Sequence, residues 1–186
     1  MKKISLARIQ IPKRKGTVFH ALIRSIIYQQ LSGKAAGTIL SRFLLLFPKQ
    51  SPTPEAIAAL SDSDFKSVGV SAQKMSYLRD LAAKYKDGTI NSKKFPTMSD
   101  EDIRQHLIAV KGIGRWTADM FLIFTLNRSN VLPVGDLGVQ NGFKIVFNLR
   151  TRPNEKKMYA LAKPYEGNWT KLSLYMWQQA DMKKTP

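Results

Sequence analysis

Residues 107–126, LIAVKGIGRWTADMFLIFTL, form the stretch that decides the fold. Apolar residues recur at helical spacing on both sides of Gly112-Ile113-Gly114, so the stretch predicts two helices joined by a tight hairpin. Glycines permit left-handed dihedrals and close approach to the backbone. Such a turn leaves backbone N–H groups at the start of the second helix, where a phosphate group can bind. The alternative is an ordinary helical turn that ends on a glycine.

The rest of the chain also carries helical signals and no convincing strand pattern. Ser71 can cap one helix, and Ser99 followed by Asp102 is a capping signal for another. Helices are predicted over residues 19–31, 34–47, 54–60, 60–69, 72–85, 100–109, 115–127, 137–149, 155–163 and 169–180. We therefore expect an all-α protein with a single domain over residues 1–186. The polar connection at 86–98 is the candidate boundary between two lobes.

The chain is strongly basic, with 30 lysine and arginine residues against 13 aspartate and glutamate residues and a formal net charge of +17. This balance favours a polyanionic partner, most often nucleic acid. A membrane is the rival, but no apolar run approaches the roughly 18 residues that a membrane span needs. Residues 1–16 carry six basic and no acidic residues and lack a secretory signal pattern, so we interpret them as a basic arm.

The sequence offers no candidate metal site. It contains no cysteine, which excludes disulfides, thiolate zinc sites and cysteine-ligated iron–sulfur clusters. Two histidines, His20 and His106, are too few for an all-histidine metal site.

Four ordered blocks resemble the helix-hairpin-helix DNA glycosylase superfamily, and more closely its 3-methyladenine, or alkylation-repair, branch. The hairpin stretch is followed by VLPVGDLGVQ (131–140), and the other blocks are FHALIRSIIYQQLSGKAAGTILSRF (19–43), GVSAQKMSYLRDLA (69–82) and LSLYMW (172–177). Together they cover roughly residues 19–180, which is far more specific than one short motif. The resemblance implies a two-lobed helical fold with a central cleft, and double-stranded DNA with damaged bases as the partner.

The resemblance also implies that Asp136, in the loop after the second hairpin helix, is the catalytic carboxylate. An aspartate at this position is a common N-cap for the helix that follows, and the two roles are compatible. Asp119, inside the second hairpin helix, is the nearest competitor and is expected to be structural.

Other site residues are assigned by position in the resemblance. A lysine stands in the lyase branch where this chain has Trp116, and tryptophan cannot form a Schiff base. Trp116 can line a pocket for a flipped base or belong to the core. The wedge that enters DNA corresponds to Gln30 and Leu31. The alternative is that Gln29 and Gln30 form a hydrogen-bonded pair that bridges the lobes. Further pocket candidates, each of which taken alone is more often a core residue, are Tyr28, Met120, Tyr175 and Trp177. The DNA-binding hairpin comprises Lys111, Gly112, Ile113, Gly114, Arg115 and Thr117.

These features predict a base-excision-repair DNA glycosylase that flips 3-methyladenine and 7-methylguanine from duplex DNA and hydrolyses the N-glycosidic bond. The alternatives are a bifunctional glycosylase-lyase, which Trp116 disfavours, and a non-catalytic DNA-binding module, which has no need of Asp136. We expect an intracellular monomer without a catalytic metal or redox cofactor, and the resemblance allows a structural monovalent cation at the hairpin. Two departures from the family pattern are Lys111, where a proline is common, and the segment 164–169, which lacks an arginine.

Overall fold

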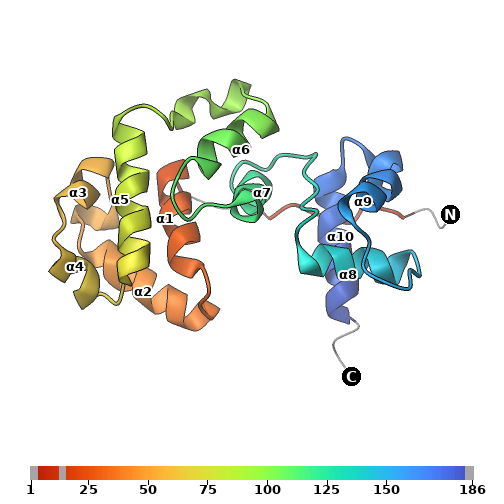
Figure 1. The fold of residues 1–186 in the computed structure, drawn as a ribbon, viewed down its shortest axis with the longest axis horizontal. Helices are drawn as coiled ribbons and strands as arrows, with labels where there is room; N and C mark the ends of the chain where they lie inside the picture. The colour runs from red at the N-terminus through yellow and green to blue at the C-terminus, as the bar shows by residue number, and fades with distance from the viewer. Residues whose placement is uncertain (1–3, 13–15, 183–186) are drawn as a thin grey trace. The chain divides into compact units, whose positions relative to one another are not determined.

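The structure is a computed structural model that describes residues 4–12 and 16–182. Within these ranges every regular element is a helix, with ten α-helices and three short 3₁₀ helices (Figure 1). The predicted all-α class is therefore confirmed for this part of the chain. None of the helices in these ranges is long and apolar enough to cross a membrane.

The described residues divide into two compact units. Residues 16–121 form the first, which we call the hairpin unit, and residues 4–12 and 122–182 form the second, the C-terminal unit. The hairpin unit contains α1 (Val18–Tyr28), α2 (Gly33–Leu45), η1 (Pro48–Gln50), α3 (Pro54–Ala59), α4 (Asp62–Ser67), α5 (Ala72–Lys86), η2 (Ser92–Thr97), α6 (Asp100–Ile108) and most of α7 (Arg115–Phe124). The C-terminal unit contains the last turn of α7, α8 (Leu137–Val146), α9 (Glu155–Ala162), η3 (Lys163–Tyr165) and α10 (Trp169–Met182).

Side-chain caps start the helices that lead to the hairpin, as the sequence predicts. The Ser71 hydroxyl accepts a hydrogen bond from the Lys74 backbone N–H at 3.3 Å and opens α5. The Ser99 hydroxyl accepts one from the Asp102 N–H at 3.1 Å and opens α6. Each cap satisfies a backbone donor that the helix itself leaves unpaired.

The apolar faces of these helices build the core of the hairpin unit. In α1, residues at helical spacing are fully buried, and Phe43 of α2 stacks on Phe65 of α4 with ring centroids 5.9 Å apart. The connection at 86–98 also belongs to this core, because Phe95 of η2 is 1% exposed and packs edge-on against Phe121 of α7. The predicted lobe boundary at 86–98 therefore does not coincide with the division between the units. Within this polar segment, two apolar side chains are buried, Ile90 and Phe95.

The C-terminal unit is organised around the crossing of α8 and α10. Gly142 of α8 lies against the backbone of Met176, where any Cβ atom would overlap the facing helix. The core around this crossing consists of Ile4, Leu132, Val134, Val139, Phe143, Met158, Ala162, Leu172 and Met176. The absence of a side chain at Gly142 thus sets how closely the two helices pack.

Three helices end three residues earlier than the sequence predicts. The helix predicted to residue 31 ends at Tyr28. The helix predicted to residue 127 ends at Phe124, and the one predicted to 149 ends at Val146. Asn127 and Asn148 adopt positive φ angles of 53° and 50°. Asparagine is among the residues that enter this left-handed conformation most readily, and there it ends a helix.

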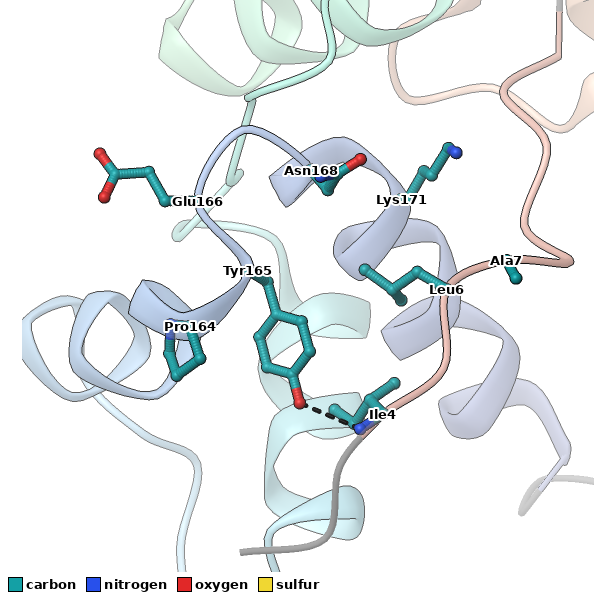
Figure 2. Close-up of a pocket in the computed structure, with 8 residues that line it drawn as sticks. All are labelled: Ile4, Leu6, Ala7, Pro164, Tyr165, Glu166, Asn168 and Lys171. Carbon is teal, nitrogen blue, oxygen red and sulfur yellow. Dashed lines mark hydrogen bonds between the residues drawn. The ribbon is translucent and has the colours of Figure 1, made fainter.

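The described part of the N-terminal segment is packed rather than free. The Ile4 backbone N–H donates to the Tyr165 hydroxyl at 3.0 Å, and Ile4 and Ile9 are both buried. Figure 2 shows Tyr165 pointing at Ile4, with Leu6 and Lys171 around the same small cavity. Residues 4–12 of the predicted basic arm are therefore packed, because isoleucines between the basic residues anchor them. Residues 1–3 and 13–15 lie outside the described residues.

Candidate functional site

The hairpin has the geometry that its glycines predict. Gly112 has a φ of 79°, in the left-handed region, and a Cβ there would overlap the Tyr77 ring of α5. At Gly114 a Cβ would meet nothing within 4 Å. Ile113 is buried between them and anchors the turn, whereas Gly112, Gly114 and Arg115 are exposed. Gly112 is thus required by the fold, while Gly114 leaves the backbone bare toward solvent.

Lys111 gives the hairpin a bond that proline could not. Its backbone N–H donates to the Asp80 carboxylate of α5 at 2.8 Å. Proline has no N–H, so the departure from the family pattern at this position adds a tether between the turn and α5.

The predicted wedge residues form a tight turn between α1 and α2. Gln29 caps the C-terminus of α1, Gln30 has a φ of 56°, and Leu31 is 38% exposed. We call Gln29–Leu31 the wedge turn. The Gln29 side-chain amide donates to the Gly112 carbonyl at 2.7 Å, so Gln29 joins the wedge turn to the hairpin. The predicted bridging role of Gln29 thus takes the form of a contact inside the hairpin unit.

A cavity of about 360 Å³ opens beside this junction. Eight residues line it, and four of them are predicted site residues: Gln30, Gly112, Trp116 and Thr117. The other lining residues are Gln29, Gln73, Lys74 and Tyr77, three of them from α5. The sequence indicated α5 only as a family block and assigned it no site residue.

Trp116 is 52% exposed, which excludes the alternative that it belongs to the core. Tyr28 and Met120, the other pocket candidates of the hairpin unit, are half-buried and do not line this cavity. The Arg24 guanidinium lies over the Tyr28 ring at 3.9 Å from its centroid, which covers one face of that ring.

Asp119 is committed to a buried ion pair. Its carboxylate accepts from the Arg104 side chain of α6 at 2.9 Å, and both residues are buried. Burial raises the pKa of the Asp119 carboxyl, and the opposing charge of Arg104 does not cancel this effect. The geometry agrees with the expected structural role, because the pair ties α6 to α7 behind the hairpin.

In the C-terminal unit, Asp136 is the N-cap of α8 and is 9% exposed. Its Oδ1 accepts from the Val139 backbone N–H at 2.8 Å and from the Trp177 indole N–H at 2.7 Å. The carboxylate therefore faces the positive end of the helix dipole and is fixed by two donors. The capping role weighed from the sequence is present.

Trp177, predicted as a pocket wall, has a defined partner in Asp136. Its ring stacks on Phe124 of α7, with centroids 5.9 Å apart and planes at 22°. Gly138 makes room for this arrangement, since a Cβ there would lie 2.7 Å from the indole Cδ1 and 3.1 Å from Asp136 Oδ1. Sequence reasoning missed Gly138 and Phe124; the glycine two residues after Asp136 was the available signal. Tyr175, the remaining candidate, packs on the core of this unit.

Among the described residues no group of three or more histidine, cysteine, aspartate or glutamate side chains could hold a metal ion. The candidate site residues are one anchored carboxylate in the C-terminal unit, and an exposed hairpin, a wedge turn and an exposed indole in the hairpin unit.

Known proteins resemble this chain over most of its length. The family described as "HhH-GPD superfamily base excision DNA repair protein" matches residues 23–166. DNA-3-methyladenine glycosylase 1 of Schizosaccharomyces pombe is 39% identical over 145 residues, which cover 77% of this chain and 63% of that protein. The chain spans about three fifths of the length of the curated relatives that it matches first.

Solved structures agree with the sequence match. The DNA-3-methyladenine glycosidase from Bacillus halodurans aligns with a TM-score of 0.86 at 33% identity, covering 95% of this chain and 81% of that one. A 3-methyladenine DNA glycosylase of Schizosaccharomyces pombe in complex with abasic DNA aligns with a TM-score of 0.76 at 32% identity, covering 92% and 84%.

Proposed function

Because this chain belongs to the HhH-GPD superfamily of base excision DNA repair proteins, we propose that it is a DNA glycosylase. Its substrate is duplex DNA that carries alkylated purines, and its products are the free base and an intact strand with an abasic site. Relatives named for 3-methyladenine support this substrate class. The observation that carries the proposal is the Asp136 carboxylate, anchored by two hydrogen bonds.

The reaction breaks the bond between the sugar C1′ and the base nitrogen. The bonding electrons leave with the base, the sugar becomes an oxocarbenium ion, and water adds to C1′ with loss of a proton. Methylation at N3 of adenine or N7 of guanine places a positive charge on the ring, so the base departs as a neutral molecule. Such bases need only modest assistance to leave.

Asp136 provides that assistance by electrostatics. A carboxylate that is already oriented stabilises developing positive charge without reorganising during the reaction. The Val139 amide and the Trp177 indole hold its Oδ1 in place, and Gly138 leaves the space for this arrangement. A module that only binds DNA has no use for a carboxylate held in this way.

The hairpin unit binds the DNA. Backbone N–H groups at the start of α7 bind phosphate, and the exposed positions of Gly112 and Gly114 let the strand approach. The wedge turn fills the gap that a flipped nucleotide leaves. The exposed Trp116 ring offers a stacking surface for a base, and a cationic base gains cation–π attraction there.

Two further parts of the proposal concern lyase activity and a cation at the hairpin. It is monofunctional, because the indole of Trp116 cannot form the Schiff base that a lyase requires. A monovalent cation at the hairpin stays a prediction. The Gly112 carbonyl already accepts the Gln29 amide, so other carbonyls of the turn would hold the ion.

The test uses a duplex oligonucleotide with a single 7-methylguanine and measures abasic sites as strand breaks made by an abasic-site endonuclease at neutral pH, where 7-methylguanine itself is not cut. The wild-type protein is expected to produce abasic sites at the lesion. Asp136→Asn is expected to lose about 100-fold or more of the single-turnover rate, as other preorganised electrostatic groups do. A wild-type protein that binds the duplex but never produces such sites would support the binding-module alternative and overturn the proposal.

A further inference from the structure

The wedge turn adopts a conformation that its own sequence does not favour. Gln30 has a positive φ of 56°, which residues other than glycine adopt at a cost. The turn has only weak backbone bonds of its own, from Gln29 N–H to Ile26 O and from Leu31 N–H to Tyr28 O, both at 3.4 Å. Surrounding groups must therefore hold it in place.

Lys74 of α5 holds the turn from one side. Its ammonium donates to the Ile27 carbonyl at 2.7 Å and to the Gln29 carbonyl at 2.9 Å. Both carbonyls lie at the C-terminal end of α1, where a positive charge is favourable. Burial lowers the pKa of Lys74, because withdrawal from water disfavours the charged ammonium.

The same helix holds the hairpin. Tyr77 packs under Gly112, and the Asp80 carboxylate accepts from the Lys111 N–H at 2.8 Å. Lys74, Tyr77 and Asp80 follow one another at three-residue intervals on α5, so one helix supports both DNA-facing elements.

Gln29 connects the wedge turn directly to the hairpin. Its backbone carbonyl is held by Lys74, and its side-chain amide donates to the Gly112 carbonyl at 2.7 Å. We propose that Gln29 is a positioning residue that couples the hairpin to the wedge turn, so that a hairpin bound to the phosphodiester backbone also holds Gln30 ready for insertion. This inference rests on the proposed function for its biological meaning, but wedge insertion can be measured without base release.

The first experiment uses 2-aminopurine beside an abasic analogue in a duplex, because its fluorescence reports unstacking by an inserted side chain. Wild-type protein is expected to raise the signal. Gln29→Leu is expected to slow the rise about tenfold, the factor that corresponds to one hydrogen bond at the upper end of the usual range. Gln105→Leu is the matched control, because it removes a 2.8 Å amide bond to Glu101 on α6 and leaves the bond from Gln29 to the Gly112 carbonyl in place. A wild-type rate in Gln29→Leu would overturn the coupling.

Two further measurements distinguish a positioning role of Gln29 from a merely structural one. Under the proposal, Gln29→Leu keeps its affinity for undamaged duplex within about threefold, since hairpin contacts to phosphate persist. The Gln29→Leu/Gln30→Ala double variant should be no slower than Gln30→Ala alone, because residues that act as one unit are not additive. Independent, multiplying effects would overturn it. If Gln29→Leu folds poorly by circular dichroism, Gln29→Glu, which keeps the size and loses the donor, decides by the same readouts.

Base release separates this inference from the proposed function. Excision of a paired lesion should slow about tenfold in Gln29→Leu, while excision of the same lesion unpaired in a bulge stays within about twofold. Equal slowing of both would overturn the coupling. A wild-type protein that releases no base from either substrate would refute the proposed function, and the 2-aminopurine assay would still decide the coupling.

Discussion

Trp177→Phe tests how the Asp136 carboxylate is held. Phenylalanine keeps a ring that can stack on Phe124 but removes the indole N–H that donates to Asp136 Oδ1 at 2.7 Å. A hydrogen bond to a charged acceptor contributes about 1.5–3 kcal/mol. If this bond orients the carboxylate in the transition state, its loss lowers the single-turnover rate by roughly 10- to 150-fold. The assay is excision of 7-methylguanine from duplex DNA under excess protein.

Trp169→Phe is the matched control on the same helix. The Trp169 indole donates to the Ala162 carbonyl at 2.9 Å, so this variant also loses one indole bond, at a site that does not touch Asp136. Trp169→Phe should lose roughly 2–4 °C in melting temperature, as expected for about 1 kcal/mol in a chain of this size, and Trp177→Phe should lose at least as much. Only Trp177→Phe should lose turnover.

Gly138→Ala reaches the same contact from another direction. It keeps the indole but places a Cβ 2.7 Å from the indole Cδ1 and 3.1 Å from Asp136 Oδ1. We expect slower excision here too, because the indole must shift. Normal turnover in both Trp177→Phe and Gly138→Ala, or an equal loss in Trp169→Phe, would refute the claim that this bond orients the carboxylate.

Three further predictions concern capping, the hairpin and the reaction class. Asp136→Ala should lower stability by about 1 kcal/mol relative to Asp136→Asn, because only asparagine can still cap α8; equal melting temperatures would contradict the capping role. Gly112→Ala should destabilise the protein by about 1–2 kcal/mol or more, whereas Gly114→Leu should leave stability unchanged yet weaken binding to damaged and undamaged duplex alike; the reverse pattern in melting and binding curves would exclude this hairpin geometry. Borohydride should trap no covalent adduct with DNA, and efficient trapping would show that Trp116 does not exclude lyase chemistry.

Local signals in the sequence predicted much of the scaffold. The caps at Ser71 and Ser99 and the left-handed Gly112 follow from chemistry within a few residues, and the structure contains all three. Asp136 as a helix cap is of the same kind. Such features depend on neighbours in the chain, so a sequence pattern can reveal them.

Contacts between distant segments were not predictable in the same way. The bond from Gln29 to Gly112 spans 83 residues, and the bond from Trp177 to Asp136 spans 41. Helical periodicity says which face of a helix is buried but not which polar group meets which across the fold. A glycine two residues after Asp136 is visible in the sequence, but the indole that lies against Gly138 is not.

Composition alone does not predict how two segments pack. Charge predicted a basic arm near the N-terminus, yet burial of Ile4 and Ile9 decides the packing of residues 4–12. Polarity predicted a lobe boundary at 86–98, yet burial of Phe95 ties that segment into the hairpin unit. One or two buried apolar side chains outweigh many solvated charges, because surface charges contribute little to stability.

The most direct test of the central claim is chromatography of the bases freed from methylated duplex DNA by the wild-type protein and by Asp136→Asn. The account predicts that the wild-type protein releases 3-methyladenine and 7-methylguanine, and that Asp136→Asn releases them about 100-fold more slowly or worse while it still binds the DNA. Release of uracil or an oxidised base in place of both methylpurines would contradict the assigned substrate class. Equal release by the two proteins would contradict the role of Asp136.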